Sequence, residues 1–363
     1  MNYSHRKSPV AGQPQRSRLR WAVIAAVTLT TLTTLAACSS SGSSSTGNGK
    51  LASSKSITVT MGDDSQPDTD YLPLEMALHT MSSTYNVQKT IIFSDDTTAL
   101  QALQQNKIQF MSESVPPSAT ALVKLPNVVA VGTRANDQWD MVVQNGINSC
   151  SDLNGKTVGL YSKAGVSTAY VKLYFAKECP NVSYNTIIIP DSTLRRQALE
   201  AGQLAATPLQ ATDAVQILNG PDKSKFHELV NFATALPGIG RDLVLTNKQT
   251  LENNPGVVQA FLTAQLQAIR QMYASPSKIP QWLATYLPGA VPANLAGLVA
   301  QYFTSRKLFC ANGGLGDSSI ADSLKTFGAA GDLPTSVTVA QLVDDAPMKK
   351  VLSKIGTSPA TSC

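Results

Sequence analysis

Acidic side chains gather in two short stretches of the sequence, each of which follows a run with the pattern of a β-strand. They are Asp63, Asp64, Asp68 and Glu113. Carboxylates grouped in this way favour a cationic ligand or a heterocycle rich in hydrogen-bond donors. Helix N-termini and the basic side chains of Arg134 and Arg241 would instead favour an anion. The four acids tip the prediction toward the first kind of ligand.

Further polar side chains follow the other predicted strands. In open α/β sheets ligands bind beyond the carboxyl ends of the strands, so these loops are expected to line one cleft. Any one of these side chains could equally cap a helix or face water, and it is their number that favours a binding site. The residues predicted to bind ligand are Asp63, Asp64, Gln66, Asp68, Tyr71, Glu113, Ser114, Trp139, Tyr161, Ser167, Thr168, Gln210 and Asp242, and the same loops also hold Ser65, Ser112, Asp137, Asp191 and Leu209.

Side chains suited to acid–base or nucleophilic catalysis are scarce. After residue 37 only two histidines occur, His79 in an amphipathic stretch and His227 next to a predicted strand. The Ser-x-x-Lys match that starts at Ser275 lacks the partner motifs of penicillin-binding enzymes. The turn Asn154-Gly-Lys-Thr lacks the upstream glycine of a phosphate-binding loop, and no closely spaced Cys or His pairs suggest zinc. We therefore expect no enzyme activity, no cofactor and no metal site.

Strand-like and helix-like runs alternate along the first two thirds of the chain, which predicts an α/β fold with mostly parallel sheets flanked by helices. The rest is helical. Asn254 and Pro255 suit the start of a long helix whose apolar stripe is Val258, Phe261, Leu262, Leu266, Ile269 and Tyr273. Strands are predicted at 57–61, 87–93, 108–111, 128–133, 157–161, 186–190, 204–207, 227–232 and 242–246. Helices are predicted at about 71–84, 97–105, 117–124, 167–177, 193–201, 211–218, 278–287, 292–306, 318–327 and 339–354.

Some 300 residues follow residue 56, which is more than one hydrophobic core usually accommodates and enough for two lobes. A turn-rich stretch after Gln144 predicts the first crossing between the lobes, and the strand that contains Leu243 predicts the return crossing. These two crossings would act as a hinge. The predicted divisions are a leader at 1–37, a tether at 38–55, a first lobe at 56–144 and 243–363, and a second lobe at 145–242.

Several stretches of the sequence resemble one family. They are DLNGKTVGL at 152–160, Gly165-Val-Ser-Thr at a predicted helix start, TTALQALQQNKIQFM at 97–111, RRQALEAGQLAAT at 195–207 and LVLTNKQTLENNPGVVQAFLTA at 243–264. These stretches resemble the substrate-binding proteins of ABC importers, in the nitrate/sulfonate/taurine and thiamine-pyrimidine-precursor branch. The resemblance runs from about Ile57 to Ala274, with Asn106 where the family usually has glycine.

The resemblance implies a two-lobed type II periplasmic-binding-protein fold with two hinge crossings. It also implies that the lobes close on a small organic molecule, either a nitrogenous heterocycle or amine or a sulfonate-like compound, and that an ABC permease and its ATPase are the partners of a monomeric protein. A related branch includes a pyrimidine synthase with a cysteine-rich motif, which neither lobe contains. The alternatives are a cell-surface ligand-sensing module without transport and an exported enzyme acting on a small nitrogen or sulfur compound.

The first 37 residues have the pattern of an export signal. Five basic side chains precede an uncharged run that ends in Leu-Ala-Ala followed by Cys38, which matches the bacterial lipoprotein box. We expect Cys38 to carry lipid, including palmitate, and to anchor the protein at the outer face of the cell membrane. The Ser/Gly-rich segment 39–55 would be a tether of roughly 20–25 Å. Without the leader the chain has 24 basic and 24 acidic side chains, so no nucleic-acid partner is expected.

Four further cysteines fit an exported chain, in which disulfides form readily. Four cysteines allow three pairings, and we favour Cys150–Cys179 with Cys310–Cys363. The first pair would close a loop of about 30 residues and stabilise the fold by roughly 3 kcal/mol. Four free thiols are the alternative.

Overall fold

The computed structural model describes residues 54–363 except 164, 317, 334–335 and 362. The predicted leader, Cys38 and nearly all of the tether therefore lie outside the described residues. No helix in the described part of the chain is long and apolar enough to cross a membrane.

The first five-stranded sheet has the strand order β4-β2-β5-β12-β6. Four of its strands run parallel to one another, and β12 runs antiparallel between β5 and β6. Its two central neighbours, β5 and β12, are buried along almost their whole length because helices cover both faces. The strands are β2 (Met61–Asp63), β4 (Ile91–Ile92), β5 (Phe110–Ser114), β6 (Val128–Thr133) and β12 (Asp242–Asn247).

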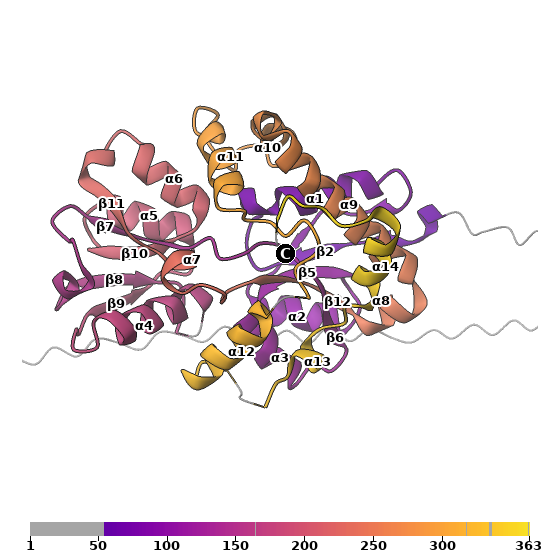
Figure 1. Cartoon of the computed structure of the whole chain (residues 1–363), viewed down its shortest axis with the longest axis horizontal. Helices are drawn as coiled ribbons and strands as arrows, with labels where there is room; N and C mark the ends of the chain where they lie inside the picture. The colour runs from indigo at the N-terminus through magenta and orange to yellow at the C-terminus, as the bar shows by residue number, and fades with distance from the viewer. Residues whose placement is uncertain (1–53, 164, 317, 334–335, 362) are drawn as a thin grey trace, which may run out of the picture. The chain divides into compact units, whose positions relative to one another are not determined.

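The second five-stranded sheet has the order β11-β7-β10-β8-β9 and repeats this arrangement, with β7 as its antiparallel strand (Figure 1). Its strands are β7 (Asp140–Gln144), β8 (Thr157–Leu160), β9 (Asn185–Ile188), β10 (Ala206–Leu209) and β11 (Phe226–Asn231). A separate two-stranded ribbon pairs β1 (Thr58–Val59) with β3 (Asn86–Val87). The α/β class with mostly parallel sheets is thus as predicted, and each sheet contains one antiparallel strand. We call each five-stranded sheet with its covering helices the first lobe and the second lobe.

In each sheet the antiparallel strand is the one that follows a crossing from the other lobe. Asp242 begins β12 opposite Ser114, the last residue of β5, and Asp140 begins β7 opposite Leu209, the last residue of β10. An arriving strand therefore starts at the edge where the parallel strands end. This geometry places both crossings beside the strand ends, where ligands bind in open α/β sheets.

The first crossing lies earlier than predicted. The apolar run Met141–Val143 was expected to end the first lobe, but it forms β7 and pairs with β10 and β11 in the second sheet. The crossing is therefore the segment 134–139, between β6 and β7. An apolar strand pattern shows that a segment is buried, but it does not show which sheet the strand joins. The return crossing lies before β12, so Asp242, which was assigned to the second lobe, begins a strand of the first sheet.

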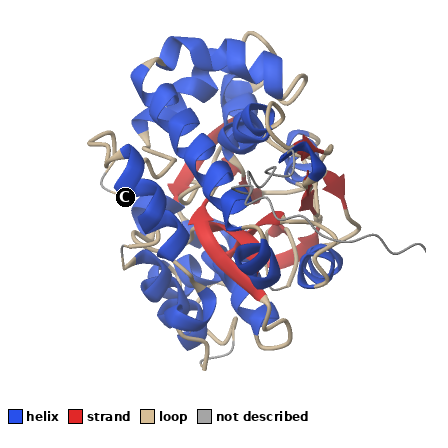
Figure 2. Cartoon of the chain, turned by 90° about the vertical axis from the view of Figure 1, so that its right-hand side faces the viewer, coloured by secondary structure: helices blue, strands red, loops and turns tan. Residues whose placement is uncertain are grey.

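Helices flank both sheets, as Figure 2 shows for the red strands enclosed by blue helices. The second lobe carries α4 (Val166–Glu178), α5 (Ser192–Glu200), α6 (Ala211–Asn219) and α7 (Phe232–Ala235). The remaining helices are α1 (Leu72–Met81), α2 (Asp96–Gln104), α3 (Val115–Leu122), α8 (Lys248–Asn253), α9 (Pro255–Ala274), α10 (Ile279–Tyr286), α11 (Ala296–Ser305), α12 (Ser319–Ala329), α13 (Val339–Leu342) and α14 (Ala346–Ile355).

The long helix α9 anchors the core of the first lobe. Asn254 is its N-cap and Pro255 its first residue, as predicted, and Phe261 stacks on Phe110 of β5 with ring centroids 4.2 Å apart. The predicted stripe from Val258 to Ile269 is buried, while Tyr273 is half-buried and donates its hydroxyl to the carbonyl of Phe309. Burying such side chains stabilises by about 1.5–3 kcal/mol each.

Three predicted elements divide. The single strand expected at 57–61 is β1 and the start of β2, which belong to different sheets. The single helix expected at 339–354 is α13 and α14, because Val343 forms a bridge to Ala130 of β6 between them and Asp344 accepts a hydrogen bond from the N–H of Ala346. The single strand expected at 87–93 is β3 and β4, which belong to different sheets.

Both disulfides are as predicted. Cys150 pairs with Cys179 and Cys310 pairs with Cys363. The first links the turn before β8 to the end of α4 within the second lobe. The second ties the C-terminal residue to the segment after α11.

Two backbone positions explain local sequence choices. Asn106 has φ 56°, a left-handed conformation that glycine adopts freely and Asn tolerates better than most residues, and its side chain also accepts from Thr250. This accounts for Asn where the family usually has glycine. Gly240, in the return crossing, has φ 78°, and a Cβ there would overlap the hydroxyl of Tyr170.

Candidate ligand-binding cleft

A cavity of about 760 Å³ opens where the strand ends of the two sheets face one another. Loops after β2, β5, β8, β9 and β10 contribute to it, together with the first crossing and the start of α4. A volume of this size suits an organic molecule. Of the residues predicted to bind ligand, the cavity is lined by Asp64, Gln66, Asp68, Tyr71, Glu113, Ser114, Trp139, Tyr161, Ser167, Gln210 and Asp242.

Two of the predicted residues lie outside this lining. Asp63 is the last residue of β2 and is fully buried, accepting hydrogen bonds from the N–H groups of Asp64 and Ser65 and from the hydroxyl of Tyr71. Thr168 is buried within the first turn of α4. Asp63 is therefore enclosed by hydrogen bonds from the loop after β2 and from Tyr71, and it does not line the cavity.

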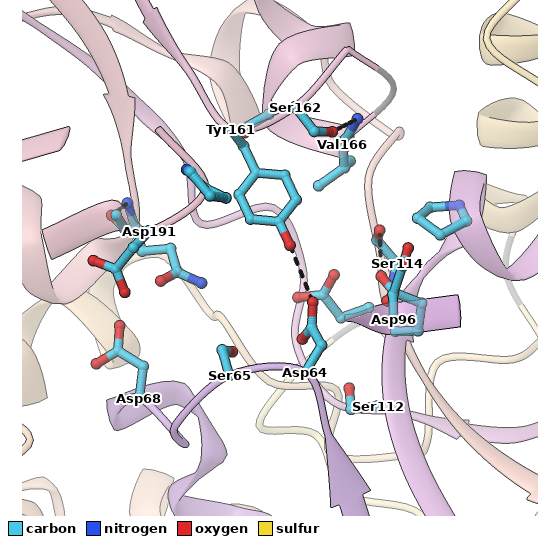
Figure 3. Close-up of a pocket in the computed structure, with 18 of the residues that line it drawn as sticks. Asp64, Ser65, Asp68, Asp96, Ser112, Ser114, Tyr161, Ser162, Val166 and Asp191 are labelled. Carbon is cyan, nitrogen blue, oxygen red and sulfur yellow. Dashed lines mark hydrogen bonds between the residues drawn. The ribbon is translucent and has the colours of Figure 1, made fainter. Parts of the chain in front are cut away.

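Tyr161 reaches across the cavity. Its hydroxyl, from the loop after β8, donates to Asp64 of the first lobe at 3.0 Å. Figure 3 shows the ring descending to Asp64, with Asp68 and Asp191 on one side and Ser114 and Asp96 on the other. The ring rests on Gly165, the N-cap of α4, where a Cβ would come within 2.4 Å of a ring carbon. Glycine at this helix start therefore lets Tyr161 bridge the two lobes.

The first lobe presents an acidic wall formed by Asp64, Asp96 and Glu113. Oε1 of Glu113 accepts from the N–H of Ser114 at 2.6 Å and from its hydroxyl. Burial raises the pKa of Glu113 well above its usual value, and the neighbouring charges of Asp64 and Asp96 raise it further. None of the three acids forms an ion pair within the described residues.

Arg134 holds the floor of the cleft together. In the first crossing, its guanidinium is paired with Asp70 and, at 2.6 Å, with Asp242, and it lies 4.2 Å from the ring centroid of Tyr71. Burial raises the pKa of Asp242 to about 6, although the positive charge of Arg134 opposes this. Arg134 is thus a paired, structural cation rather than one free for an anionic ligand.

Arg195 was not predicted, although it lies at the cavity. It is fully buried on α5, where Nε donates to the carbonyl of Pro208 and Nη1 to that of Ile189, while Nη2 has no partner. Burial lowers its pKa to about 10 despite the charges of Asp213 and Asp191. Helical spacing in the sequence could have predicted this burial, because Arg195 lies three and four residues before Ala198 and Leu199, on the buried face of the helix.

Other lining residues were also missed. Asp96 and Asp213 begin or lie within the first turns of α2 and α6, where acids usually act as caps. Asp213 accepts from Arg196 and Thr193, and Asp68 accepts from Thr212 at 2.7 Å, so α6 touches the loop after β2. Burial, Asp70 and Asp213 raise the pKa of Asp68 to about 7.

Two lining hydroxyls are buried without a hydrogen-bond partner, those of Ser112 and Ser167. The cavity lining among the described residues includes no histidine and no cysteine. Nor do the described residues contain a group of three or more His, Cys, Asp or Glu side chains placed to hold a metal ion. Buried polar atoms normally have partners, so the unpartnered ones mark where a ligand would bind.

Comparison of the sequence with protein families places residues 86–279 in the family described as NMT1/THI5 like. The chain belongs to the NMT1/THI5-like family. The matched region takes in Asp96 and Glu113 of the acidic wall, Tyr161, Arg195 and the strands and helices of the second lobe, whereas Asp64 precedes it. No curated protein matches the chain.

Solved structures share the fold of this NMT1/THI5-like chain. A ligand-binding component of an ABC-type import system from Staphylococcus aureus, solved with zinc bound, has a TM-score of 0.67 at 13% identity and covers 81% of this chain and 99% of its own. The periplasmic nitrate-binding protein NrtA from Synechocystis PCC 6803 gives 0.65 at 12%, with 83% and 89% covered. The alkanesulfonate-binding protein SsuA from Xanthomonas axonopodis pv. citri, bound to MOPS, gives 0.61 at 16%, with 80% and 99% covered. The fold is that of type II periplasmic binding proteins.

Proposed function

We propose that this protein is the solute-binding component of an ABC importer and captures a small polar organic molecule between its lobes. The cleft carries this proposal, because polar side chains from the strand ends of both sheets converge on one cavity and several of them lack partners. Proteins of the same fold are named as nitrate-binding, alkanesulfonate-binding and import-system components. An ABC permease and its ATPase would be the partners of the monomer.

Closure about the two crossings would trap the ligand. Hinge closure of this kind is the motion that periplasmic binding proteins use. Contacts that already join the lobes include Tyr161 with Asp64 and Thr212 with Asp68. The hinge would comprise the segment 134–139 and the segment that leads into β12.

We infer that the protein binds its ligand without transforming it. The lining offers hydroxyls, carboxylates and the two buried guanidiniums of Arg134 and Arg195, but within the described residues it holds no histidine or cysteine to act as base or nucleophile. The four cysteines of the described residues are paired in disulfides. Neither a sensing module nor an exported enzyme gains support from a specific contact in the cleft.

Ligand capture is testable by thermal shift and fluorescence. A ligand that binds only the folded state raises the melting temperature, so a metabolite screen on the mature protein should yield stabilising compounds.

Trp139 lines the cavity, whereas Trp282 on α10 does not. A stabilising compound should change the indole fluorescence of wild type and of Trp282→Phe but not that of Trp139→Phe. Asp64→Ala should weaken binding by about 1–3 kcal/mol. A broad screen without any stabilising compound would contradict the proposal.

We further propose that Cys38 anchors the protein by lipid. Its lipoprotein box lies outside the described residues, so the sequence alone supports this. Cys38→Ser is expected to abolish lipid labelling and to release the protein from the membrane fraction. Cys310→Ser serves as a control, because that cysteine is paired with Cys363 within the fold. Unchanged membrane retention of the Cys38 variant would refute the anchor.

A further inference from the structure

The charges that line the cleft divide into paired and unpaired groups. Arg134 is neutralised by Asp70 and Asp242, and Asp213 is paired with Arg196. These ion pairs leave little charge for a ligand to neutralise, although Nε of Arg134 and Oδ1 of Asp70 have no hydrogen-bond partner.

Four lining acids of the first lobe, Asp64, Asp68, Asp96 and Glu113, have no ion pair among the described residues, and on the second lobe the exposed Asp191 is also unpaired. Asp64, Asp96 and Glu113 repel one another and have only hydroxyl and backbone N–H donors as partners within the described residues. Burial raises the pKa of Glu113 well above its usual value, and the charges of Asp64 and Asp96 add to this rise. A cationic or donor-rich group in the cavity would relieve this repulsion.

The unpaired buried cation lies on the second lobe. Of the three basic residues that line the cavity, Lys124 is exposed, Arg134 is paired, and Arg195 is fully buried without an ion pair among the described residues. Its Nη2 has no partner, and the lining hydroxyl of Ser167 on α4 is also buried and unpartnered. Both donors need an acceptor oxygen.

Tyr161 lies between the acidic wall of the first lobe and Arg195 of the second lobe. Its hydroxyl touches Asp64, and the guanidinium carbon of Arg195 lies 5.9 Å from its ring centroid. The same guanidinium lies 5.7 Å from the ring of Trp139. The acidic wall and the free arginine donor are thus separated by about one aromatic side chain, a span that a small organic molecule can bridge.

We propose that the ligand is a small zwitterion, with a protonated nitrogen against the acids of the first lobe and a carboxylate or other anionic oxygen group against Arg195 of the second. This inference rests on the proposed function and specifies its ligand class. A simple anion would leave the acidic wall without a counter-charge, and a simple cation would leave Arg195 buried and unpaired, which is strongly unfavourable. Only a ligand with both charges satisfies both walls, and it does so best when the lobes are closed.

The test uses matched probes that differ in one charge. The zwitterions 4-aminobutyrate and taurine are compared with butyrate, ethanesulfonate, butylamine, ethylamine and nitrate by thermal shift and calorimetry on the mature protein. At least one zwitterion should raise the melting temperature and bind at least tenfold more tightly than either of its single-charge counterparts. Equal binding of a single-charge probe, or no response to any zwitterion, would overturn the inference.

Variants locate the two ends of the bound probe. Arg195→Met and Glu113→Gln should each reduce zwitterion binding at least tenfold, whereas Lys349→Met, at an exposed position of α14 outside the cavity lining, should not. If Arg195→Met fails to fold, Arg195→Lys retains the charge but loses the directed Nη2 donor and should still weaken binding. A metabolite that binds but carries a single charge would leave the importer proposal standing and refute the zwitterion, so the two failures are distinguishable.

Discussion

Replacing Arg134 with Met is expected to lower the free energy of unfolding by roughly 3–5 kcal/mol, because it leaves two buried carboxylates without their counter-charge. Asp70 is fully buried and Asp242 nearly so, and both depend on this guanidinium. The variant also loses the cation that lies over the ring of Tyr71. Urea unfolding at pH 7 measures the change.

The control is Lys349→Met, which removes an exposed ion pair with Asp345. Exposed pairs contribute little, so its unfolding curve should nearly match that of wild type. The deficit of Arg134→Met should shrink at pH 5, because the carboxyl of Asp242, whose pKa burial already raises to about 6, can then take up a proton. Equal unfolding midpoints for the two variants would show that Arg134 does not hold the crossing.

The sequence predicted most elements and the location of the cleft, because both follow from local patterns. Strand β6 occupies the predicted residues 128–133, and α4, α5 and α6 begin within one residue of expectation. Polar residues after successive parallel strands meet at one sheet edge, so eleven of the thirteen proposed binding residues line the cavity.

The sequence alone did not show which strands pair with one another or which side chains come into contact. The stretch that forms β7 was recognised as strand-like, yet its sheet is decided by long-range pairing with β10 and β11. Asp63 and Asp64 are adjacent acids, and only the structure shows that the first is enclosed at the end of β2 while the second lines the cavity.

Arg195 and Arg196 are adjacent basic residues whose different environments were also not predicted. Arg196 donates hydrogen bonds to Glu200 and Asp213. Arg195 is fully buried, and its Nη2 has no hydrogen-bond partner. Arginine side chains are mostly exposed in proteins, so this tendency predicts that both Arg195 and Arg196 are solvated. Helical spacing favours position 195 for the buried face, because both Ala198 and Leu199 follow it at three and four residues, whereas position 196 has only Leu199 at that spacing.

The free energy of unfolding of the wild-type protein is expected to fall as the pH rises from 5 to 8, and Asp63 should be a large contributor. Burial raises the pKa of Asp63 to about 8, and Asp64 adds to the shift, against an unfolded value near 3.8. Between these values the folded state retains a proton that the unfolded state has released. The stabilisation from Asp63 is therefore complete below about pH 4 and is lost as the pH rises through 8. Asp68 and Asp140, with pKa values raised by burial to about 7, act in the same direction.

Asp63→Asn isolates this contribution. An amide has the shape of the protonated acid, so its oxygen can accept from the N–H groups of Asp64 and Ser65 while its NH₂ group faces Tyr71, whose hydroxyl can turn to accept. The variant should therefore lose about 1.4 kcal/mol per pH unit from the slope of unfolding free energy between pH 5 and 7. Asp222→Asn, at an exposed ion pair with Lys225, should leave the slope unchanged. Parallel profiles for wild type and Asp63→Asn would show that the Asp63 carboxyl is already ionised at pH 5, and the loop after β2 would then be held by a buried charge rather than by a protonated acid.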